Sequence, residues 1–393
     1  MRTRKVILWT LGVLAALLWW MHHTSRMTYE EVEMLRESEE LAHARKTLRE
    51  WTEACYGTYA EGRRYRTTDT IIECFREASY LFGGRAAFSV SEGMAVLTVD
   101  DPECTGEAAE DKWHVLVVCG QHARELVTSE LCLDLLYEVL FASEPGMAWH
   151  FLPVMNPAGR ERVERDVARE GCWRGNAGGV DLNRNFPSWV DDEHKARVRA
   201  QWERHANETS PGAYPGSERE TRAVMEVLTR DDLRVDMVLN VHSGTEAVAV
   251  PYDCCALERH PLYSQMVHAA QTAKRPLYED PGELGREVHE KLQQWLERLP
   301  VQQASHATIL YESVGTLVDY AVGVARVPVG YTVEIFGVDE PVARVLAGPD
   351  ATEGEVCFAQ FNPAPGEALD RALRVWSRYL CDLAHAWKEM ARK

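Results

Sequence analysis

The sequence predicts an α/β fold, a three-layer sandwich whose central, mixed and mostly parallel sheet is flanked by helices. Short apolar runs typical of buried strands alternate along the chain with longer segments of helical periodicity. Strands are expected at 95–99, 114–119, 151–154 and 237–241, and helices at 128–141, 218–229 and 367–390. At 393 residues, the chain is long enough for one large α/β domain or two smaller ones.

The N-terminus predicts a membrane segment. Arg2, Arg4 and Lys5 precede an uncharged, largely apolar stretch at residues 6–21. This stretch is short for a transmembrane helix, which needs about 20 residues, yet no small-residue cleavage pattern follows it. We interpret residues 1–26 as an uncleaved signal anchor, with a cleaved signal peptide or a buried core helix as alternatives. The basic residues would place the remainder of a single-pass protein on the lumenal or extracellular side, whereas cleavage would give a secreted protein.

Residues 27–64 are expected to form a juxtamembrane helix or stalk. The part from about residue 28 to residue 51 is rich in Glu and Arg, and its apolar residues recur at helical spacing. From residue 65 the strand and helix pattern begins, so we interpret residues 65–393 as one α/β domain. Within it, residues 156–215 predict a long irregular stretch, and residues 367–390 predict a closing amphipathic helix.

The charge balance excludes one class of partner. Lys and Arg total 43 and Asp and Glu total 61, which gives a net charge of -18 at pH 7. Such a chain repels the phosphates of nucleic acids unless a basic patch overrides the net charge, and no such patch is found. Nucleic acid is therefore not expected as a partner.

The ten cysteines all follow the apolar N-terminal segment, and their even number permits an oxidising compartment. Cys119 and Cys132 fall in apolar segments and are expected to be buried thiols, whereas the pairing of the others stays open. No C-x-x-C pair is present to indicate a cysteine-based zinc site. Asn207 begins an N-x-T sequon, which predicts glycosylation on the lumenal or extracellular side.

Metal-ligating side chains stand at the ends of two predicted strands. His122 and Glu125 follow the strand that ends at Cys119, and His242 directly follows the strand expected at 237–241. Ligands in α/β proteins bind beyond the carboxyl ends of such strands. An H-x-x-E pair or a lone strand-end histidine is weak by itself, but His, Glu and His together suit zinc and leave a fourth position for water.

A carboxylate at position 334 has no obvious structural reason to be there. Glu334 lies between Val333 and Ile335 in an apolar run that predicts a strand. Burying a carboxylate is costly without a partner or a task, so Glu334 is predicted to be a site residue.

These residues, in this order, resemble the M14 family of zinc metallocarboxypeptidases, the carboxypeptidase A and B type. The resemblance spans about residues 65–393 and marks that segment as the catalytic domain. It implies that His122, Glu125 and His242 bind one Zn²⁺ per chain. It also implies Glu334 as the general base.

Further positions carry the resemblance into the substrate site. Trp173 and Arg174 resemble the segment whose arginine polarises the scissile carbonyl, so Arg174 is assigned a catalytic role. Asn183 and Arg184 match the pair that holds the C-terminal carboxylate. Tyr311 matches the mobile tyrosine that closes over the substrate.

The resemblance implies a zinc-dependent exopeptidase that releases C-terminal amino acids from peptides or proteins by Glu-assisted attack of zinc-bound water. Two positions bear on specificity. Val318 is expected to line an apolar pocket, whereas Asp253 matches an aspartate of basic-specific relatives. A preference for basic C-terminal residues is favoured, and aliphatic or aromatic preference stays open. The stretch before residue 65 is too short for the family's inhibitory propeptide, so no zymogen is expected.

Other functions compete with this interpretation. A catalytically silent relative could bind peptides without cleaving them, although all three ligands and Glu334 are present. A membrane-tethered adhesion module would use the same histidines as surface groups. A metallohydrolase for cell-wall or glutamylated peptides would share the metal site and differ in substrate. The oligomeric state is left open.

Overall fold

The computed structural model describes residues 39–56, 65–100, 112–142, 146–201, 208–230, 233–273, 294, 297–305 and 310–391. The predicted anchor at residues 6–21 and the sequon residue Asn207 lie outside these ranges. Among the described helices, none combines the length and apolar character needed to cross a bilayer. The predicted stalk is described from residue 39 to residue 56 as the helix α3.

One eight-stranded mixed sheet forms the centre of the molecule, with the strand order β1-β2-β4-β3-β5-β8-β6-β7. Four strands in its middle, β4, β3, β5 and β8, are parallel to one another, and β2 and β6 are antiparallel to their neighbours in that group. The strands are β1 Ala86–Ser91, β2 Met94–Val99, β3 Trp113–Val118, β4 Met147–Leu152, β5 Met237–His242, β6 Thr245–Val250, β7 Val301–Gln303 and β8 Val329–Phe336.

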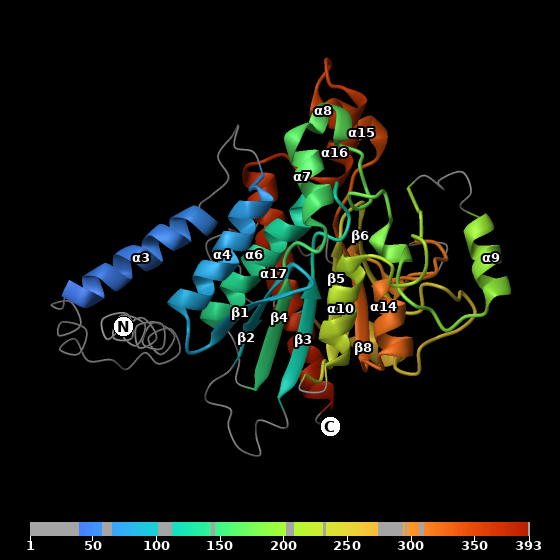
Figure 1. Cartoon of the computed structure of the whole chain (residues 1–393), viewed down its shortest axis with the longest axis horizontal. Coiled ribbons are helices and arrows are strands. Elements are labelled where there is room, and N and C mark those ends of the chain that lie inside the picture. The colour runs from blue at the N-terminus through green and yellow to red at the C-terminus, as the bar shows by residue number, and fades with distance from the viewer. Residues whose placement is uncertain are drawn as a thin grey trace.

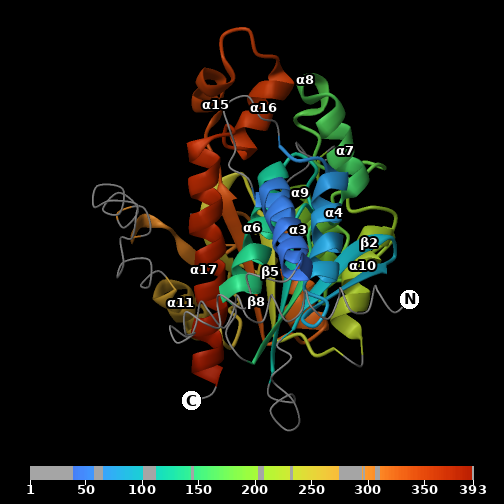
Figure 2. The ribbon, with the colours of Figure 1, turned by 90° about the vertical axis from the view of Figure 1, so that its left-hand side faces the viewer.

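Helices cover both faces of the sheet, because residues of the buried strands point alternately to each side. Val115 and Val117 of β3 join one hydrophobic cluster, whereas Leu116 and Val118 join another on the opposite face. The larger cluster is covered by α3 Glu39–Tyr56, α4 Thr68–Leu81, α6 Leu126–Ala142, α11 Tyr263–Thr272 and α17 Glu367–Ala391. Figure 2 shows α17, α6 and α4 side by side on this face.

The other face is covered by α10 Arg219–Thr229, by α14 Leu317–Asp319 and by the short helical turn at Tyr320–Val324. Figure 1 shows the sheet between these elements and the helices of the first face. The mixed α/β architecture with helices on both sides of the sheet is therefore confirmed.

The remaining helices lie beyond the carboxyl ends of the central strands. Four of them gather at the top of Figure 1. They are α7 Pro157–Arg165, α8 Val167–Glu170, α15 Glu340–Ala347 and α16 Glu353–Phe361. The helix α9, Asp192–Ala200, stands apart at the right of the same view.

Two sequence expectations differ from the structure. The strand expected at 151–154 is β4, which begins four residues earlier at Met147. The stretch expected to be irregular, 156–215, contains α7, α8 and α9. These helices are short and polar on most sides, so they lack the apolar periodicity that predicts a helix. Their starts are instead fixed by caps, such as the Asn156 side chain that accepts the N–H of Gly159.

Three disulfides link cysteines whose pairing the sequence left open: Cys55–Cys74, Cys172–Cys357 and Cys254–Cys255. The first ties α3 to α4, and the second ties the segment after α8 to α16. Cys119 and Cys132 are buried free thiols, as expected.

Asp134 of α6 faces α17, and its carboxyl accepts a hydrogen bond from the Ser377 hydroxyl at 2.8 Å. Burial raises the pKa of Asp134 from 3.8 to about 6. Between these two values the folded chain keeps a proton that the unfolded chain has released. The free energy of unfolding therefore falls as the pH rises through this window.

We expect Asp134→Asn to remove this pH dependence. Relative to the variant, the unmodified chain should lose about 2 kcal/mol of unfolding free energy between about pH 4 and about pH 6. Denaturant titrations at a series of pH values measure the difference. Asp350→Asn, at an exposed position, serves as the matched control. Equal slopes for Asp134→Asn and the unmodified chain would contradict the assignment.

Candidate active site

The strand order brings two strand ends to one point. From β3 the chain passes through α6 to β4 on one side of β3, whereas β5 pairs with the other side of β3. Such a reversal leaves a crevice at the carboxyl ends of the two strands. Gly120, directly after β3, has a φ of 63°, and a Cβ there would lie 3.2 Å from the Val154 Cα. Glycine permits this tight turn, after which His122 enters the crevice.

The three predicted metal ligands meet in this crevice. One ligand atom from each of His122, Glu125 and His242 lies within 4.8 Å of the others. The Glu125 carboxylate lies 2.8 Å from His122 Nδ1 and 3.0 Å from His242 Nδ1. It also accepts the backbone N–H of Ser243 at 3.1 Å. All three ligand side chains are buried.

The charges of this cluster depend on one another. Burial by itself would raise the pKa of Glu125, but the imidazoles of His122 and His242 outweigh burial and hold that pKa far below 4.5. Burial would likewise lower the pKa of His242, yet the Glu125 carboxylate raises it above 6.5. For His122, burial and the Arg174 guanidinium lower the pKa. The carboxylate is thus ionised, and its stability depends on positive charge beside it.

The donor set fits a zinc ion. The Nδ1 atoms of His122 and His242 lie 3.0 Å apart, and the Glu125 carboxylate is beside both. Two imidazole nitrogens and one carboxylate are a typical ligand set of catalytic zinc, in which a fourth position stays open. A dication would satisfy all three groups at once.

Asp181 holds His122 from its other side. Its Oδ1 lies 3.1 Å from His122 Nε2, and its Oδ2 accepts a hydrogen bond from Arg174 Nε at 2.9 Å. The neighbouring Arg174, Arg184 and His122 overcome the effect of burial and hold the pKa of Asp181 well below 3.8. A carboxylate at Nε2 keeps the proton on that nitrogen and leaves Nδ1 free to bind metal.

Arg174 reaches the same cluster as a cation. Its Nη1 lies 3.8 Å from Glu125 Oε1. Although burial opposes the charge, Asp181, Tyr311 and Glu125 raise the pKa of Arg174 above its ordinary value. Arg174 therefore offers a fixed positive charge beside the metal ligands.

The strand β8 places Glu334 next to His242, since the two residues are paired in register. Glu334 Oε2 is buried and has no hydrogen-bond partner among the described residues. Burial, with a further contribution from the Glu125 carboxylate, raises the pKa of Glu334 to about 7. A carboxyl with such a pKa can accept a proton and return it near neutral pH.

A cavity of about 340 Å³ opens onto these groups and also reaches the predicted carboxylate anchor. Arg184 Nη1 donates to the Asn183 carbonyl at 2.7 Å, and Nη2 donates to the Tyr311 hydroxyl at 3.1 Å. Asn183 Oδ1 accepts the N–H of Leu317 at 2.9 Å, which fixes the amide. Asn183, Arg184 and Tyr311 all line the cavity.

The two predicted specificity residues lie in different places. Asp253 lines the cavity, is buried, and has an Oδ1 without a hydrogen-bond partner among the described residues. Val318 is fully buried and packs closely against Gly330. A Cβ added to Gly330 would lie 2.9 Å from Cγ1 of Val318. Val318 was expected to line the specificity pocket, but it is not among the residues that line the cavity. Its backbone precedes Asp319, which accepts the N–H groups of Asp253 and Cys254.

Two site residues were not predicted. Asp181 precedes the Asn183 and Arg184 pair. A metal-bound imidazole needs a carboxylate partner, and this need could have indicated Asp181. Arg124 also lines the cavity, with its guanidinium 4.2 Å from the Phe361 ring and 3.2 Å from the Glu208 carboxylate. Its place between His122 and Glu125 in the same short turn was the available signal.

The arrangement fits the ligand set of a catalytic zinc ion and lies at the point where an α/β sheet reverses its strand order. Residues 90–342 match the family model described as zinc carboxypeptidase, and because this match covers more than half of the chain, the chain belongs to that family. The resemblance drawn from the sequence is thereby confirmed.

Individual relatives match shorter segments. Carboxypeptidase B2 of Rattus norvegicus is 28% identical over 165 residues, which cover 38% of this chain and 37% of the relative. Murein peptide amidase A of Escherichia coli (strain K12) is 33% identical over 136 residues, which cover 32% of this chain and 52% of the relative. The chain thus matches little more than a third of the rat relative's length.

Solved structures share the fold. Carboxypeptidase A from Helicoverpa armigera superposes with a TM-score of 0.61 at 18% identity, covering 89% of this chain and 82% of that chain. Bovine thrombin-activatable fibrinolysis inhibitor, in complex with tick carboxypeptidase inhibitor, has a TM-score of 0.60 at 19% identity and covers 83% and 98%. At these identities the likeness concerns the fold alone.

We expect His122→Ala to abolish zinc binding, because it removes one of three ligands. Asp181→Asn should weaken zinc binding roughly 10- to 100-fold, since the imidazole loses its orienting carboxylate. Zinc content after dialysis, measured by mass spectrometry, and competition with a chelator give the two affinities. Asp350→Asn is the control for a lost surface carboxylate. Full zinc content in His122→Ala would contradict the ligand assignment.

Proposed function

We propose that this chain is a zinc-dependent carboxypeptidase that releases amino acids from the C-termini of peptides or proteins. One observation carries the proposal: a single cavity holds the three zinc ligands, a carboxyl with a near-neutral pKa, and a guanidinium suited to a free carboxylate. A hydrolytic centre and a receptor for a chain end therefore lie within reach of one substrate.

The side chains divide the chemistry among them. His122, Glu125 and His242 would hold the zinc ion, which would supply a Lewis acid and lower the pKa of water. Glu334 accepts the proton of the attacking water and later delivers it to the leaving amine. Arg174, a permanent cation, stabilises the oxygen that becomes negatively charged, an effect commonly worth about 3 kcal/mol.

The carboxylate anchor explains why cleavage would be confined to the chain end. The planar guanidinium of Arg184 can form two parallel hydrogen bonds to a carboxylate, and an internal peptide bond offers no such group. Asn183 is held beside it, and Tyr311 lies against the same guanidinium. Peptides with an amidated C-terminus should therefore be poor substrates.

We expect Glu334→Gln to keep zinc at one ion per chain while kcat falls roughly 10²- to 10⁴-fold, because the amide cannot accept a proton. Release of the C-terminal residue from a peptide library, followed by mass spectrometry with and without a chelator, measures the loss. The zinc content of the same preparation is the internal control. Turnover close to that of the unmodified chain would remove Glu334 from the base role.

For the substrate class, we propose basic C-terminal residues. Asp253 is 5% exposed and lines the cavity, and burial raises its pKa. The neighbouring Asp319 carboxyl is also buried, and burial together with Asp253 raises its pKa. A pair of crowded carboxyls is relieved when an ammonium or guanidinium enters, so Lys or Arg side chains would bind more favourably than apolar ones.

We expect Asp253→Asn to lower kcat/KM for peptides ending in Arg or Lys by roughly 100-fold, or about 3 kcal/mol. Peptides ending in Leu or Phe should change little, because they do not depend on the charge. Parallel kinetics on four peptides that differ only in the last residue give the comparison, with Asp350→Asn as control. An equal loss for all four peptides would indicate a structural role for Asp253 instead.

A second substrate class is favoured by one relative. The 33% identity to murein peptide amidase A suggests a second function, in which the same zinc site hydrolyses murein peptides. The reaction would need the same ligands and Glu334, and only the substrate would differ. Including murein peptides in the library separates the two, because release from them and not from ordinary C-termini would favour the amidase function.

We also propose that the catalytic domain lies on the lumenal or extracellular side of a membrane. The disulfides Cys55–Cys74 and Cys172–Cys357 support this location, since such bonds persist in oxidising compartments.

A further inference from the structure

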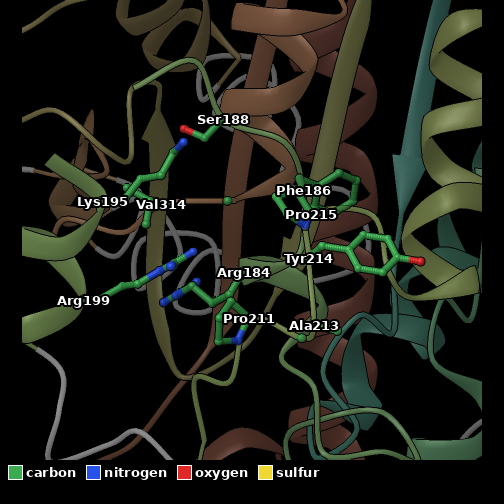
Figure 3. A pocket seen from close by; sticks show the side chains of 12 residues that line it. Arg184, Phe186, Ser188, Lys195, Arg199, Pro211, Ala213, Tyr214, Pro215 and Val314 are labelled. Carbon is green, nitrogen blue, oxygen red and sulfur yellow. The ribbon is translucent and has the colours of Figure 1, made fainter. Parts of the chain in front are cut away.

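A second, smaller cavity borders the carboxylate anchor. It has a volume of about 120 Å³ and is lined by residues of three segments, 184–188, 195–199 and 211–215, together with Val314 and Gly315 (Figure 3). Arg184 is the one residue that lines both this cavity and the site cavity. Along the same loop, Tyr311 and Ser313 line the site cavity, whereas Val314 and Gly315 line the second one. The two spaces therefore adjoin at Arg184.

The charge of the second cavity is opposite to that of the whole chain. Its lining residues include Arg184, Lys195 and Arg199 and no Asp or Glu, although the chain as a whole has a net charge of -18. Lys195 and Arg199 are four residues apart on α9, so they lie on one face of that helix and repel each other. An anion between them would relieve that repulsion.

Among the described residues, the counter-charges available to Lys195 and Arg199 are weak. Lys195 pairs with Asp192 at 3.1 Å, but the Asp192 side chain is 100% exposed, and such pairs contribute little. Arg199 forms no side-chain hydrogen bond or ion pair with any residue in the described ranges. Figure 3 shows the side chains of Arg184 and Arg199 with their guanidinium ends directed into the same space.

A neutral donor completes the lining. Ser188 Oγ is buried and has no hydrogen-bond partner within the described part of the chain. Figure 3 places Ser188 next to the ammonium end of Lys195. A buried hydroxyl without a partner costs free energy, and an acceptor oxygen in the cavity would remove that cost.

We propose that this cavity binds a small free oxyanion such as phosphate, held by Arg184, Lys195, Arg199 and the Ser188 hydroxyl. The volume leaves room for several water molecules, and hence for a small ion, but not for a peptide segment. Because Arg184 is shared, a bound oxyanion weakens the attraction of that guanidinium for the substrate carboxylate. The site therefore acts as an inhibitory anion site, a kinetic consequence that rests on the proposed carboxypeptidase function.

Titration calorimetry with inorganic phosphate tests binding independently of catalysis. The full-length, zinc-loaded chain should bind phosphate, and the double variant Lys195→Gln with Arg199→Gln should lose at least 10-fold in affinity. Arg169→Gln, whose side chain is 85% exposed on α8, controls for a lost surface charge and should bind as the unmodified chain does. Equal phosphate affinity in the double variant and the unmodified chain would overturn the proposal, because binding would then be at zinc or in the site cavity.

Kinetics test the coupling through Arg184. At constant ionic strength, phosphate should raise KM for a peptide substrate several-fold without changing kcat, and the double variant should be insensitive to phosphate. Potassium chloride at equal ionic strength controls for screening. An unchanged KM at phosphate concentrations that saturate the calorimetric site would overturn the inhibitory role. If no variant or unmodified chain cleaves peptides, the proposed function fails, while the calorimetric result still decides the anion site.

Discussion

The active site depends on how the buried carboxylate of Glu125 is stabilised by the groups around it. Glu125 is removed from water at the carboxyl ends of β3 and β5, and its hydrogen-bond partners in the described part of the chain, the two imidazoles and the Ser243 N–H, help to offset the loss of hydration. Those partners come from strands that are adjacent in the sheet but about 120 residues apart in sequence. The two hydrophobic clusters that hold the sheet from both faces therefore also hold the metal ligands at their separation.

Two glutamates in this crevice are driven in opposite directions by their surroundings. Glu125 faces two imidazoles and stays ionised far below its ordinary pKa. Glu334 lies a strand away, its Oε2 has no hydrogen-bond partner in the described ranges, and its pKa is raised to about 7. Separation of pKa values between like groups is how a site assigns one carboxyl to charge and another to proton transfer. The sheet places Glu334 in register with His242, and burial raises the pKa of Glu334 although the His242 imidazole acts to lower it.

The sequence could predict those features that depend on short segments of the chain. His122, Glu125 and His242 could be found because each stands at the end of an apolar strand, and strand ends meet at one edge of a parallel sheet. The cavity-facing side of Asp253 and the burial of Val318 against Gly330 depend on how a loop folds over the sheet, which no periodicity encodes. The helices α7, α8 and α9 were missed for a related reason, since their polar sequences leave caps as the main local signal.

Arg184 differs from Arg174 in the charge of its hydrogen-bond partners. Asp181 receives stabilisation from Arg174 as well as from Arg184, so the two cations share one buried carboxylate. Among the described residues, Arg184 donates only to a carbonyl and a phenol, which are neutral acceptors. Its positive charge is therefore left without a direct anionic partner in the hydrogen bonds that hold it. In the proposed function, a guanidinium fixed in this way would bind an incoming carboxylate at little cost in side-chain entropy, since its orientation would already be set before the substrate arrives.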